Sequence, residues 1–181
     1  MRVVAGSAKG AQLKTLEGES TRPTADRVKE GMFSAVQFLL PGAEVLDLFA
    51  GSGQLGIEAL SRGAAKAVFI DKSRAAAEVV IQNLKTTGLF KQARVAAMEA
   101  EQYLRGTQET FDLVLLDPPY RQETVQRLLP LLEARLRENG VILCETEKEA
   151  RLPQQEGALV KKKSYVYGKI MVTKYQKEGG V

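Results

Sequence analysis

One stretch limits what this chain can fold into more than any other, the segment VLDLFAGSGQLGIEAL from Val45 to Leu60. Its first residues are mainly apolar, which is typical of a buried strand, and its last residues have the apolar spacing of a helix. Three glycines, Gly51, Gly53 and Gly56, lie between the two parts. Glycine adopts positive φ angles and lets a ligand approach the backbone closely. The stretch therefore predicts a strand, a glycine turn and a helix N-terminus, which together form a frequent ligand site at the edge of a parallel sheet.

The charges around this turn narrow the choice of ligand. The spacing Gly51-x-Gly53-x-x-Gly56, with Asp71 twenty residues after Gly51, matches a dinucleotide fingerprint in which the acidic residue holds a ribose hydroxyl. Asp47 argues against a dinucleotide, because its carboxylate would lie close to the pyrophosphate and like charges repel. S-adenosylmethionine carries ammonium and sulfonium charges that Asp47 would attract, together with a ribose for Asp71. For this stretch alone, a strand–turn–helix whose glycines serve only tight packing remains an alternative.

Length and composition exclude several classes of protein. With 181 residues, of which 44% are hydrophobic, the chain has the size and balance of a globular protein with one core. We expect a single domain over 1–181, with an N-terminal arm at 1–21 and a catalytic core at 22–181. No apolar run reaches the length of a membrane span. Residues 1–6 turn polar too soon for a signal peptide, so a cytoplasmic location is expected.

The cysteine and histidine content of the chain limits which disulfides, metal sites and catalytic bases it can form. Cys144 is the only cysteine, and the chain has no histidine. A disulfide framework and a cysteine metal site are excluded, and the commonest general base and metal ligand is missing, so no metal is expected. Cys144 lies in the apolar run VILCE, and we expect it to be a buried small residue, remote from any site motif.

The net charge of +4 is unevenly distributed along the chain. Residues 1–31 carry a net charge of +2 and residues 151–181 a net charge of +5, whereas residues 32–150 carry −3. An acidic core with basic ends suggests a polyanionic partner that the ends would bind. A solvated basic tail explains the same distribution equally well.

Hydrophobic periodicity and breaker residues predict alternating strands and helices along the chain. Residues 2–16 alternate weakly around two glycines and predict a β-hairpin or an extended arm. Thr24 is expected to be the N-cap of a helix that ends near Pro41. Further strands are expected at 45–49, 67–70, 93–98, 112–116 and 141–144, helices at 54–62, 73–87, from 101 onward and at 122–138, and two final strands at 159–166 and 169–175.

This order of elements predicts the fold class. Strands that alternate with helices indicate an α/β fold with a doubly wound, mostly parallel sheet. The two final strands have no helix between them, so we expect a C-terminal antiparallel pair. The arm would add a small N-terminal β-hairpin extension.

Four acidic residues, Asp47, Asp71, Glu99 and Asp117, are expected at the carboxyl ends of different strands. Ligands of such sheets bind at these ends, so the acids and the glycine turn predict one cofactor site. Asp71 would accept hydrogen bonds from ribose hydroxyls, and Glu99 with Ala100 would lie near the adenine. The predicted cofactor-binding residues are Asp47, Phe49, Ala50, Gly51, Ser52, Gly53, Asp71, Lys72, Glu99 and Ala100.

The second anchor is Asp117-Pro118-Pro119-Tyr120, which follows an apolar strand and supplies the predicted catalytic residues. The prolines fix the backbone and keep the Pro118 carbonyl out of a helix ladder. The Asp117 carboxylate and this carbonyl could accept two hydrogen bonds from one planar amino group, on whose ring Tyr120 could stack. Holding this poor nucleophile in line with a sulfonium methyl group is mainly positioning and stabilisation of developing positive charge. A base within a stem would first have to be flipped out, and a proline-rich turn after a strand is the alternative.

These motifs resemble the class I S-adenosylmethionine-dependent amino-methyltransferases, which share Asp47-x-x-x-Gly51-x-Gly53 and Asp117-Pro-Pro-Tyr120. The narrower resemblance is to the RsmD-type 16S ribosomal RNA guanine-N2 methyltransferases, and it covers nearly the whole chain. It is carried by Arg22-Pro-Thr-x-Asp26-Arg27-x-Lys-Glu30, by Leu46-Asp-Leu-Phe-Ala-Gly-Ser-Gly53, by Leu60-Ser-Arg-Gly63, by Asp117-Pro-Pro-Tyr120 and by Tyr167-Gly168.

The resemblance implies a Rossmann-like class I methyltransferase fold and methyl transfer from S-adenosylmethionine to the exocyclic N2 of one guanine in 16S rRNA. It implies as substrate a small ribosomal subunit or an assembly intermediate rather than bare RNA. We expect no membrane partner, and a monomer. The predicted RNA-binding residues are Arg2, Lys9, Arg22, Thr24, Arg27, Lys161, Lys162 and Lys163.

The chain departs from the resemblance at one point of the arm. The family usually has an arginine pair around the glycine of its hairpin, where this chain has Ala8-Lys9-Gly10-Ala11. Lysine is a point charge and alanine carries none, so forked phosphate contacts are lost at this place.

The sequence also bears on several other functions. The same chemistry could serve adenine N6 in nucleic acid or glutamine in a protein, because each offers a planar amino group. A catalytically silent RNA-binding module on the same scaffold is a second possibility, which intact Asp47, Asp117 and Tyr120 speak against. Asp47 and the missing histidine disfavour a nicotinamide oxidoreductase. Cytosine-C5 methylation needs a cysteine nucleophile, which Cys144 is not expected to supply.

Overall fold

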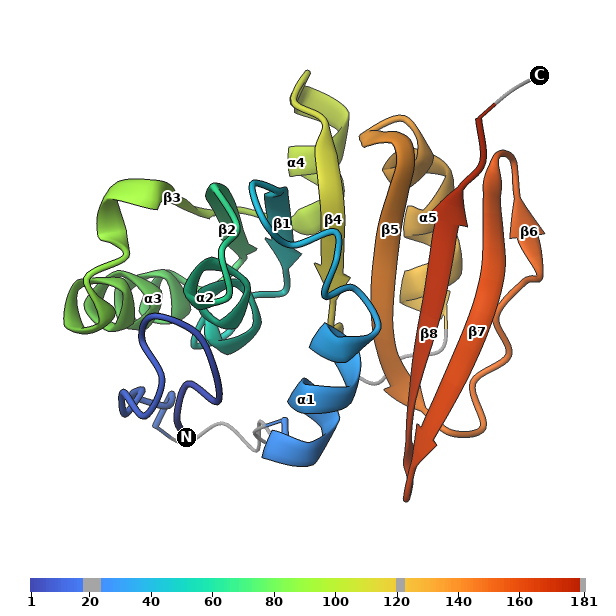
Figure 1. Ribbon diagram of the computed structural model, residues 1–181. Helices are drawn as coiled ribbons and strands as arrows, with labels where there is room; N and C mark the ends of the chain where they lie inside the picture. Colours follow the sequence, from blue (N-terminus) through green and yellow to red (C-terminus); the bar gives the residue numbers. More distant parts are fainter. Residues whose placement is uncertain (18–23, 120–122, 180–181) are drawn as a thin grey trace.

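The computed structural model describes residues 1–17, 24–119 and 123–179, and these form an eight-stranded sheet with helices on both faces (Figure 1). The strands are β1 (Glu44–Leu48), β2 (Lys66–Asp71), β3 (Ala93–Ala97), β4 (Phe111–Leu116), β5 (Leu136–Glu147), β6 (Gln155–Glu156), β7 (Leu159–Tyr167) and β8 (Ile170–Lys177). The helices are α1 (Asp26–Ser34), α2 (Gln54–Ser61), α3 (Arg74–Thr87), the short 3-10 helix η1 (Phe90–Gln92), α4 (Ala100–Gly106) and α5 (Glu123–Glu133).

The strands follow the order β3-β2-β1-β4-β5-β8-β7-β6 across the sheet. Strands β1 to β5 pair in parallel, whereas β8 pairs antiparallel with both β5 and β7. The predicted doubly wound, mostly parallel sheet with a C-terminal antiparallel pair is therefore confirmed. The winding reverses between β1 and β4, and in open α/β sheets ligands bind beyond the carboxyl ends of the strands at such a point.

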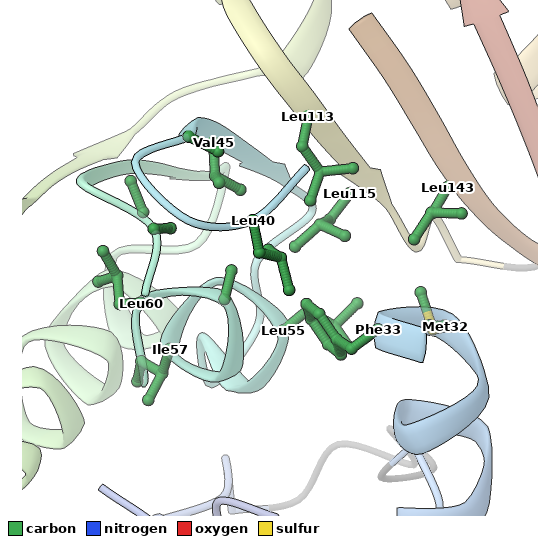
Figure 2. Close-up of a cluster of buried hydrophobic side chains, with 14 of the residues drawn as sticks. Met32, Phe33, Leu40, Val45, Leu55, Ile57, Leu60, Leu113, Leu115 and Leu143 are labelled. Carbon is green, nitrogen blue, oxygen red and sulfur yellow. The ribbon is translucent and has the colours of Figure 1, made fainter. Parts of the chain in front are cut away.

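Two hydrophobic cores lie on the two faces of the sheet. Helices α1, α2 and α3 cover one face, and α4 and α5 cover the other. Figure 2 shows the first core, where Phe33 of α1 and Ile57 of α2 belong to the same cluster as Leu115 of the central strand β4. Side chains alternate along β1, so Val45 faces the first core and Leu46 the second. The same alternation decides which face each side chain reaches at the carboxyl edge.

The N-terminal arm packs against α2. An antiparallel bridge joins Arg2 and Gln12, as expected for a small hairpin. The carboxylate of Glu58, which is completely buried, accepts hydrogen bonds from the backbone N–H groups of Val4 and Ala5 at 2.9 and 3.0 Å. A buried charge of the core therefore holds the arm in place.

Helix α1 begins and ends differently from the prediction. Its N-cap is Ala25 and no side chain caps it, so the assignment of Thr24 as N-cap is wrong. The Thr24 hydroxyl has another partner, described below, in the sheet. The helix ends at Ser34 rather than near Pro41, and the chain continues in turns until β1.

Helix α5 is shorter than predicted, and β5 is correspondingly longer. The helix ends at Glu133, and Leu136 already pairs with Phe111 of β4, with a shift in register behind it. The Arg137 guanidinium pairs with Glu44 of β1 and Asp112 of β4, each at 3.0 Å. Pairing with the neighbouring strands therefore overrides the helical pattern of this stretch. Within the described ranges, no helix is long and apolar enough to cross a membrane.

Candidate active site

Strand register brings three acidic residues to one face at the carboxyl edge of the sheet. Leu116 of β4 pairs with Leu48 of β1 on one side and with Cys144 of β5 on the other. Asp47 precedes the first pair on its strand, while Asp117 and Glu145 follow the second. Because side chains alternate, all three acids point to the face that α1, α2 and α3 cover.

The glycine turn after β1 has a left-handed backbone. Phe49, Gly51 and Gly53 have φ angles of 58°, 56° and 82°. Such an angle is a strained conformation for a bulky residue like Phe49, and strain of this kind clusters at ligand sites. A Cβ added at Gly51 would meet no atom within 4 Å, so this face of the turn is open to an approaching group.

Gly56 of the same motif allows close packing between α2 and β2. A Cβ at this position would lie 2.3 Å from the Phe69 ring and 3.1 Å from Oδ2 of Asp47. Only glycine lets α2 approach β2 this closely. The packing role that the sequence left open as an alternative therefore applies to Gly56, whereas Gly51 lies against open space.

Asp47 lies under the turn with 1% of its surface exposed. Its Oδ2 accepts a hydrogen bond from the Gly56 N–H at 2.9 Å. Burial raises the pKa of Asp47 to about 8, the Gly56 N–H opposes this rise, and the nearby Asp71 charge adds to it. The carboxyl is therefore largely neutral at pH 7 in the free protein, and a cation placed beside it would favour its ionised form.

Asp71 joins the glycine turn to the start of α3. Its Oδ2 accepts from the Gly51 N–H and its Oδ1 accepts from the Ser73 N–H, both at 2.9 Å. A carboxylate has about four acceptor sites, so Asp71 can still accept hydrogen bonds from ribose hydroxyls. Asp71 therefore orients the turn as well as offering a ribose contact.

The remaining predicted cofactor residues lie around this turn. Ala50 and Ser52 are buried, and the Ser52 carbonyl accepts a hydrogen bond from the Asn83 side chain at 2.9 Å. Lys72 and Glu99 are exposed beyond the ends of β2 and β3, and the neighbouring Ala100 is buried at the start of α4. Their contact with adenosine stays a prediction.

The Asp117 motif lies next to the turn, beyond β4. Asp117 is half-buried, Pro118 is buried and Pro119 is exposed, whereas Tyr120 lies outside the described residues. Burial of its carboxyl, together with the charges of Glu145 and Asp47, raises the pKa of Asp117 well above its ordinary value. The carboxyl group is therefore a strong proton acceptor once it is ionised.

Glu145 is a polar residue of this site that sequence reasoning missed. It is 3% exposed, and its Oε2 accepts a hydrogen bond from the Thr24 hydroxyl at 3.3 Å. Burial raises the pKa of Glu145, and the Thr24 hydroxyl opposes the rise. The signal was present, because an acid directly follows the apolar strand residues 141–144, as at the ends of the other strands.

Cys144 is closer to the site than expected. It lies fully buried on β5, and burial together with the charges of Asp117 and Glu145 raises the pKa of its thiol. The expectation that Cys144 is remote from any site motif is therefore wrong. The raised pKa keeps the thiol protonated, which still disfavours a cysteine nucleophile.

The predicted RNA-binding residues are not gathered at one place. Arg2 and Lys9 lie exposed on the arm, Arg27 lies exposed on α1, and the lysines of residues 161–163 lie on β7. In Figure 1 the arm and β7 lie on opposite sides of α1. A substrate that touched all of them would have to extend across the α1 side of the molecule.

Several of these basic groups already have partners. The Arg2 guanidinium pairs with Asp26 at 3.0 Å, and Lys162 pairs with Glu178. Lys163 lies over the Tyr165 ring, 5.0 Å from its centroid. Arg22 lies outside the described residues.

Thr24 is buried against the sheet rather than exposed like the other described RNA-binding candidates on the arm and α1. It is 3% exposed and its hydroxyl donates to Glu145, so its predicted place on the RNA side of the site stays a prediction. Its contact with Glu145, the neighbour of Asp117, places it close to the predicted amine site. In the part of the chain that the structure describes, no group of three or more possible metal ligands occurs.

Comparison with known proteins relates the chain to one family of proteins. Residues 1–176 match the family described as Conserved hypothetical protein 95. The chain is 44% identical to YlbH of Bacillus subtilis (strain 168), covering 99% of this chain and 100% of the relative. It is 34% identical to ribosomal RNA small subunit methyltransferase D of Escherichia coli (strain K12), covering 98% of this chain and 90% of that protein.

A solved structure agrees with this relationship. The yhhF structure from Escherichia coli is 35% identical, covers 99% of both chains and superposes with a TM-score of 0.89. The chain therefore belongs to the family described as conserved hypothetical protein 95, together with ribosomal RNA small subunit methyltransferase D, as the motifs around Asp47 and Asp117 indicated.

Proposed function

We propose that this protein transfers a methyl group from S-adenosylmethionine to the exocyclic N2 amine of a guanine in small-subunit ribosomal RNA. One observation carries the proposal: Asp117, whose carboxyl has a raised pKa, and the fixed backbone of Pro118 lie beside an open glycine turn on the same edge of the sheet. The family relationship supports the substrate class, since one relative is named as a methyltransferase of small-subunit ribosomal RNA.

The residues of the turn fit S-adenosylmethionine. When bound, this molecule supplies an electrophilic methyl group on a positively charged sulfur. The open face of Gly51 leaves room for a close backbone approach, and Asp71 retains acceptor sites for ribose hydroxyls. Asp47 offers a buried carboxyl that a nearby cation would ionise. A pyrophosphate would have the opposite effect, because its negative charge would hold the proton on Asp47.

Asp117 and the Pro118 carbonyl would hold the target amine. Both groups accept hydrogen bonds, and together they match the two N–H donors of a planar amino group. The predicted roles separate cleanly: residues of the turn bind the cofactor, and Asp117 positions the amine. Their contribution to rate is positioning together with stabilisation of developing positive charge.

The decisive experiment is methyl transfer from labelled S-adenosylmethionine to small ribosomal subunits that lack the modification. Assembly intermediates, bare 16S rRNA and genomic DNA are tested in parallel. We expect label in 16S rRNA as N2-methylguanine, with subunits or intermediates preferred over bare rRNA. Label in DNA or protein would move the substrate to adenine N6 or glutamine. Binding of S-adenosylmethionine without any transfer would favour a silent binding module.

The division of roles has its own test. Asp117→Ala is expected to abolish transfer and to leave S-adenosylmethionine affinity within a few-fold of the parent, because Asp117 faces the amine rather than the cofactor. Calorimetric titration of the variant measures that affinity. Loss of cofactor binding in this variant would contradict the assignment.

A further inference from the structure

A second buried carboxyl lies beside Asp117, on the neighbouring strand. Leu116 of β4 pairs with Cys144 of β5, so Asp117 and Glu145 each come one residue after this pair. Neighbouring strands lie about 4.8 Å apart, and the two side chains point to the same face. The two carboxyls interact, since the charge of Glu145 adds to the effect of burial in raising the pKa of Asp117.

The position of Glu145 is fixed from outside the sheet. The Thr24 hydroxyl, which comes from the segment before α1, donates to Oε2 of Glu145 at 3.3 Å. Both residues are 3% exposed, whereas Asp117 is half-buried. Asp117 can thus meet a substrate, while Glu145 lies behind it. Burying a carboxyl lowers the stability of a protein unless a hydrogen-bond partner compensates for the lost water, so a buried carboxyl next to a catalytic one suggests a role in function.

We propose that Glu145 is a positioning residue of the transfer site: held by the Thr24 hydroxyl, its buried carboxylate directs the proton released by the target amine onto Asp117. The inference rests on the proposed transfer to an amino group. In that step the N2 lone pair forms the new N–C bond, and the S–C bond breaks with its electron pair left on sulfur. The proton leaves N2 for the Asp117 carboxylate, whose attraction for it is strengthened by the neighbouring negative charge of Glu145.

Other titratable groups lie on the strands and the helix next to this pair. Asp47 on β1 also raises the pKa of Asp117, and Cys144 on β5 has a thiol whose own pKa is raised. The lysines on two neighbouring elements have other partners: Lys174 on β8 donates to the Ala35 carbonyl, and Lys29 on α1 donates to the Arg2 carbonyl. Opposite Glu145 on β8 lies the apolar Val172. Asp47 acts on Asp117 in the same direction as Glu145, so its contribution must be held constant in a test.

The first experiment is the pH dependence of kcat/KM in Glu145→Gln, with Glu147→Gln as the matched control. Glutamine keeps the shape and can still accept from Thr24, but it removes the charge. We expect the acid limb of the profile to move to lower pH by about one unit or more. The plateau rate at high pH should fall, because Asp117 becomes a weaker proton acceptor. Glu147 is exposed on the same strand, and its variant should keep the parent profile.

A purely structural role of Glu145 would change the pH profile of kcat/KM in a different way. If Glu145 only supports packing, its variant loses rate or stability at every pH without moving the acid limb, which would overturn the proposal. Thr24→Val should share part of the shift, because it removes the hydroxyl that favours the ionised Glu145. Thr24→Ser should restore the parent profile.

The second experiment needs no activity. Carbon-13 NMR of the free protein follows the titration of the Asp117 carboxyl in the parent and in Glu145→Gln. We expect its midpoint to fall in the variant and to stay unchanged in Glu147→Gln. An unchanged midpoint would overturn the inference even if methyl transfer is confirmed. A lowered midpoint in a protein that methylates no substrate would instead contradict the proposed function.

Discussion

At the scale of single residues, the glycines of one motif differ in what they do. Gly56 is needed because Phe69 and Asp47 leave no space for a Cβ, whereas Gly51 is needed for its positive φ and its open face. The spacing alone shows three glycines but not this difference. Substitution separates the two tasks, because one affects packing and the other affects the approach of a ligand.

Gly56→Ala is expected to lower the free energy of unfolding by about 3 kcal/mol, because the added methyl overpacks a fully buried contact. Gly51→Ala should cost only about 1 kcal/mol, the penalty of a left-handed backbone, while it weakens S-adenosylmethionine binding. Urea unfolding and calorimetric titration of both variants measure the two effects. Equal losses of stability would contradict the separation of roles.

The raised pKa of Asp47 predicts how the stability of the folded protein depends on pH. Its pKa is about 8 in the folded protein and near 4 when exposed, so the folded state binds more protons between these values. The free energy of unfolding should therefore fall as pH rises from about 4 to about 8, by at most ~1.4 kcal/mol per unit from this group.

Asp47→Asn is the matched variant for this prediction, because asparagine can still accept the Gly56 N–H. The variant should show a flatter decline of stability over the same pH window and weaker cofactor binding. Thermal or urea unfolding from pH 4 to pH 9 measures both proteins. A slope as steep as that of the parent would show that Asp47 is ionised in the folded state.

At the scale of elements, the arm depends on a charge in α2. Glu58 accepts two backbone hydrogen bonds from the arm and pairs with Arg62 at 2.9 Å, although its carboxylate is completely buried. Arg62 in turn lies over the Phe33 ring of α1, 5.0 Å from its centroid. The arm, α2 and α1 are therefore connected through two side chains, Glu58 and Arg62.

Glu58→Gln is expected to destabilise the protein by about 2 kcal/mol, because at least one partly buried N–H of the arm loses its acceptor. Hydrogen exchange at the Val4 and Ala5 amides should become faster than in the parent. Glu78→Gln, an exposed position on α3, serves as the control. Unchanged exchange at the two amides would contradict the role assigned to Glu58.

At the scale of the whole molecule, the basic ends of the chain lie apart. The arm and β7 are on opposite sides of α1 (Figure 1). Asp47 lies on β1 and Asp117 follows β4, and these two strands are neighbours in the middle of the sheet. This arrangement suits a folded RNA that contacts both ends while one flipped base enters the site. Substitution of the lysines on β7 tests whether this end of the chain contacts RNA.

Lys162→Ala combined with Lys163→Ala is expected to weaken binding to 16S rRNA and to reduce the salt dependence of the affinity. Each lost phosphate contact should lower the slope of log K against log salt by about 1. Lys66→Ala with Lys91→Ala removes the same charge from exposed positions elsewhere on the molecule. Equal weakening in both double variants would indicate a general charge effect rather than an RNA site on β7.

Much of the fold follows from the sequence, because its strongest signals are local. Apolar strands, breaker residues and the glycine turn each act over a few neighbouring residues, and they place Asp47, Asp71 and Asp117 at strand ends. The exceptions are instructive. Residues 136–138 are predicted to be helical but join β5, because Phe111, Asp112 and Glu44 on other strands hold them there.

The sequence by itself therefore determined the class of fold, the glycine turn and the acidic residues that begin the site. Only the tertiary structure decided that Thr24 meets Glu145 across 121 positions of the chain, and that Asp47 is buried deeply enough to hold its proton. The physical reason is the separation along the chain of the residues that interact. Local spacing controls backbone geometry, whereas burial and strand register depend on residues far apart in the chain, and these set the charge state of the site.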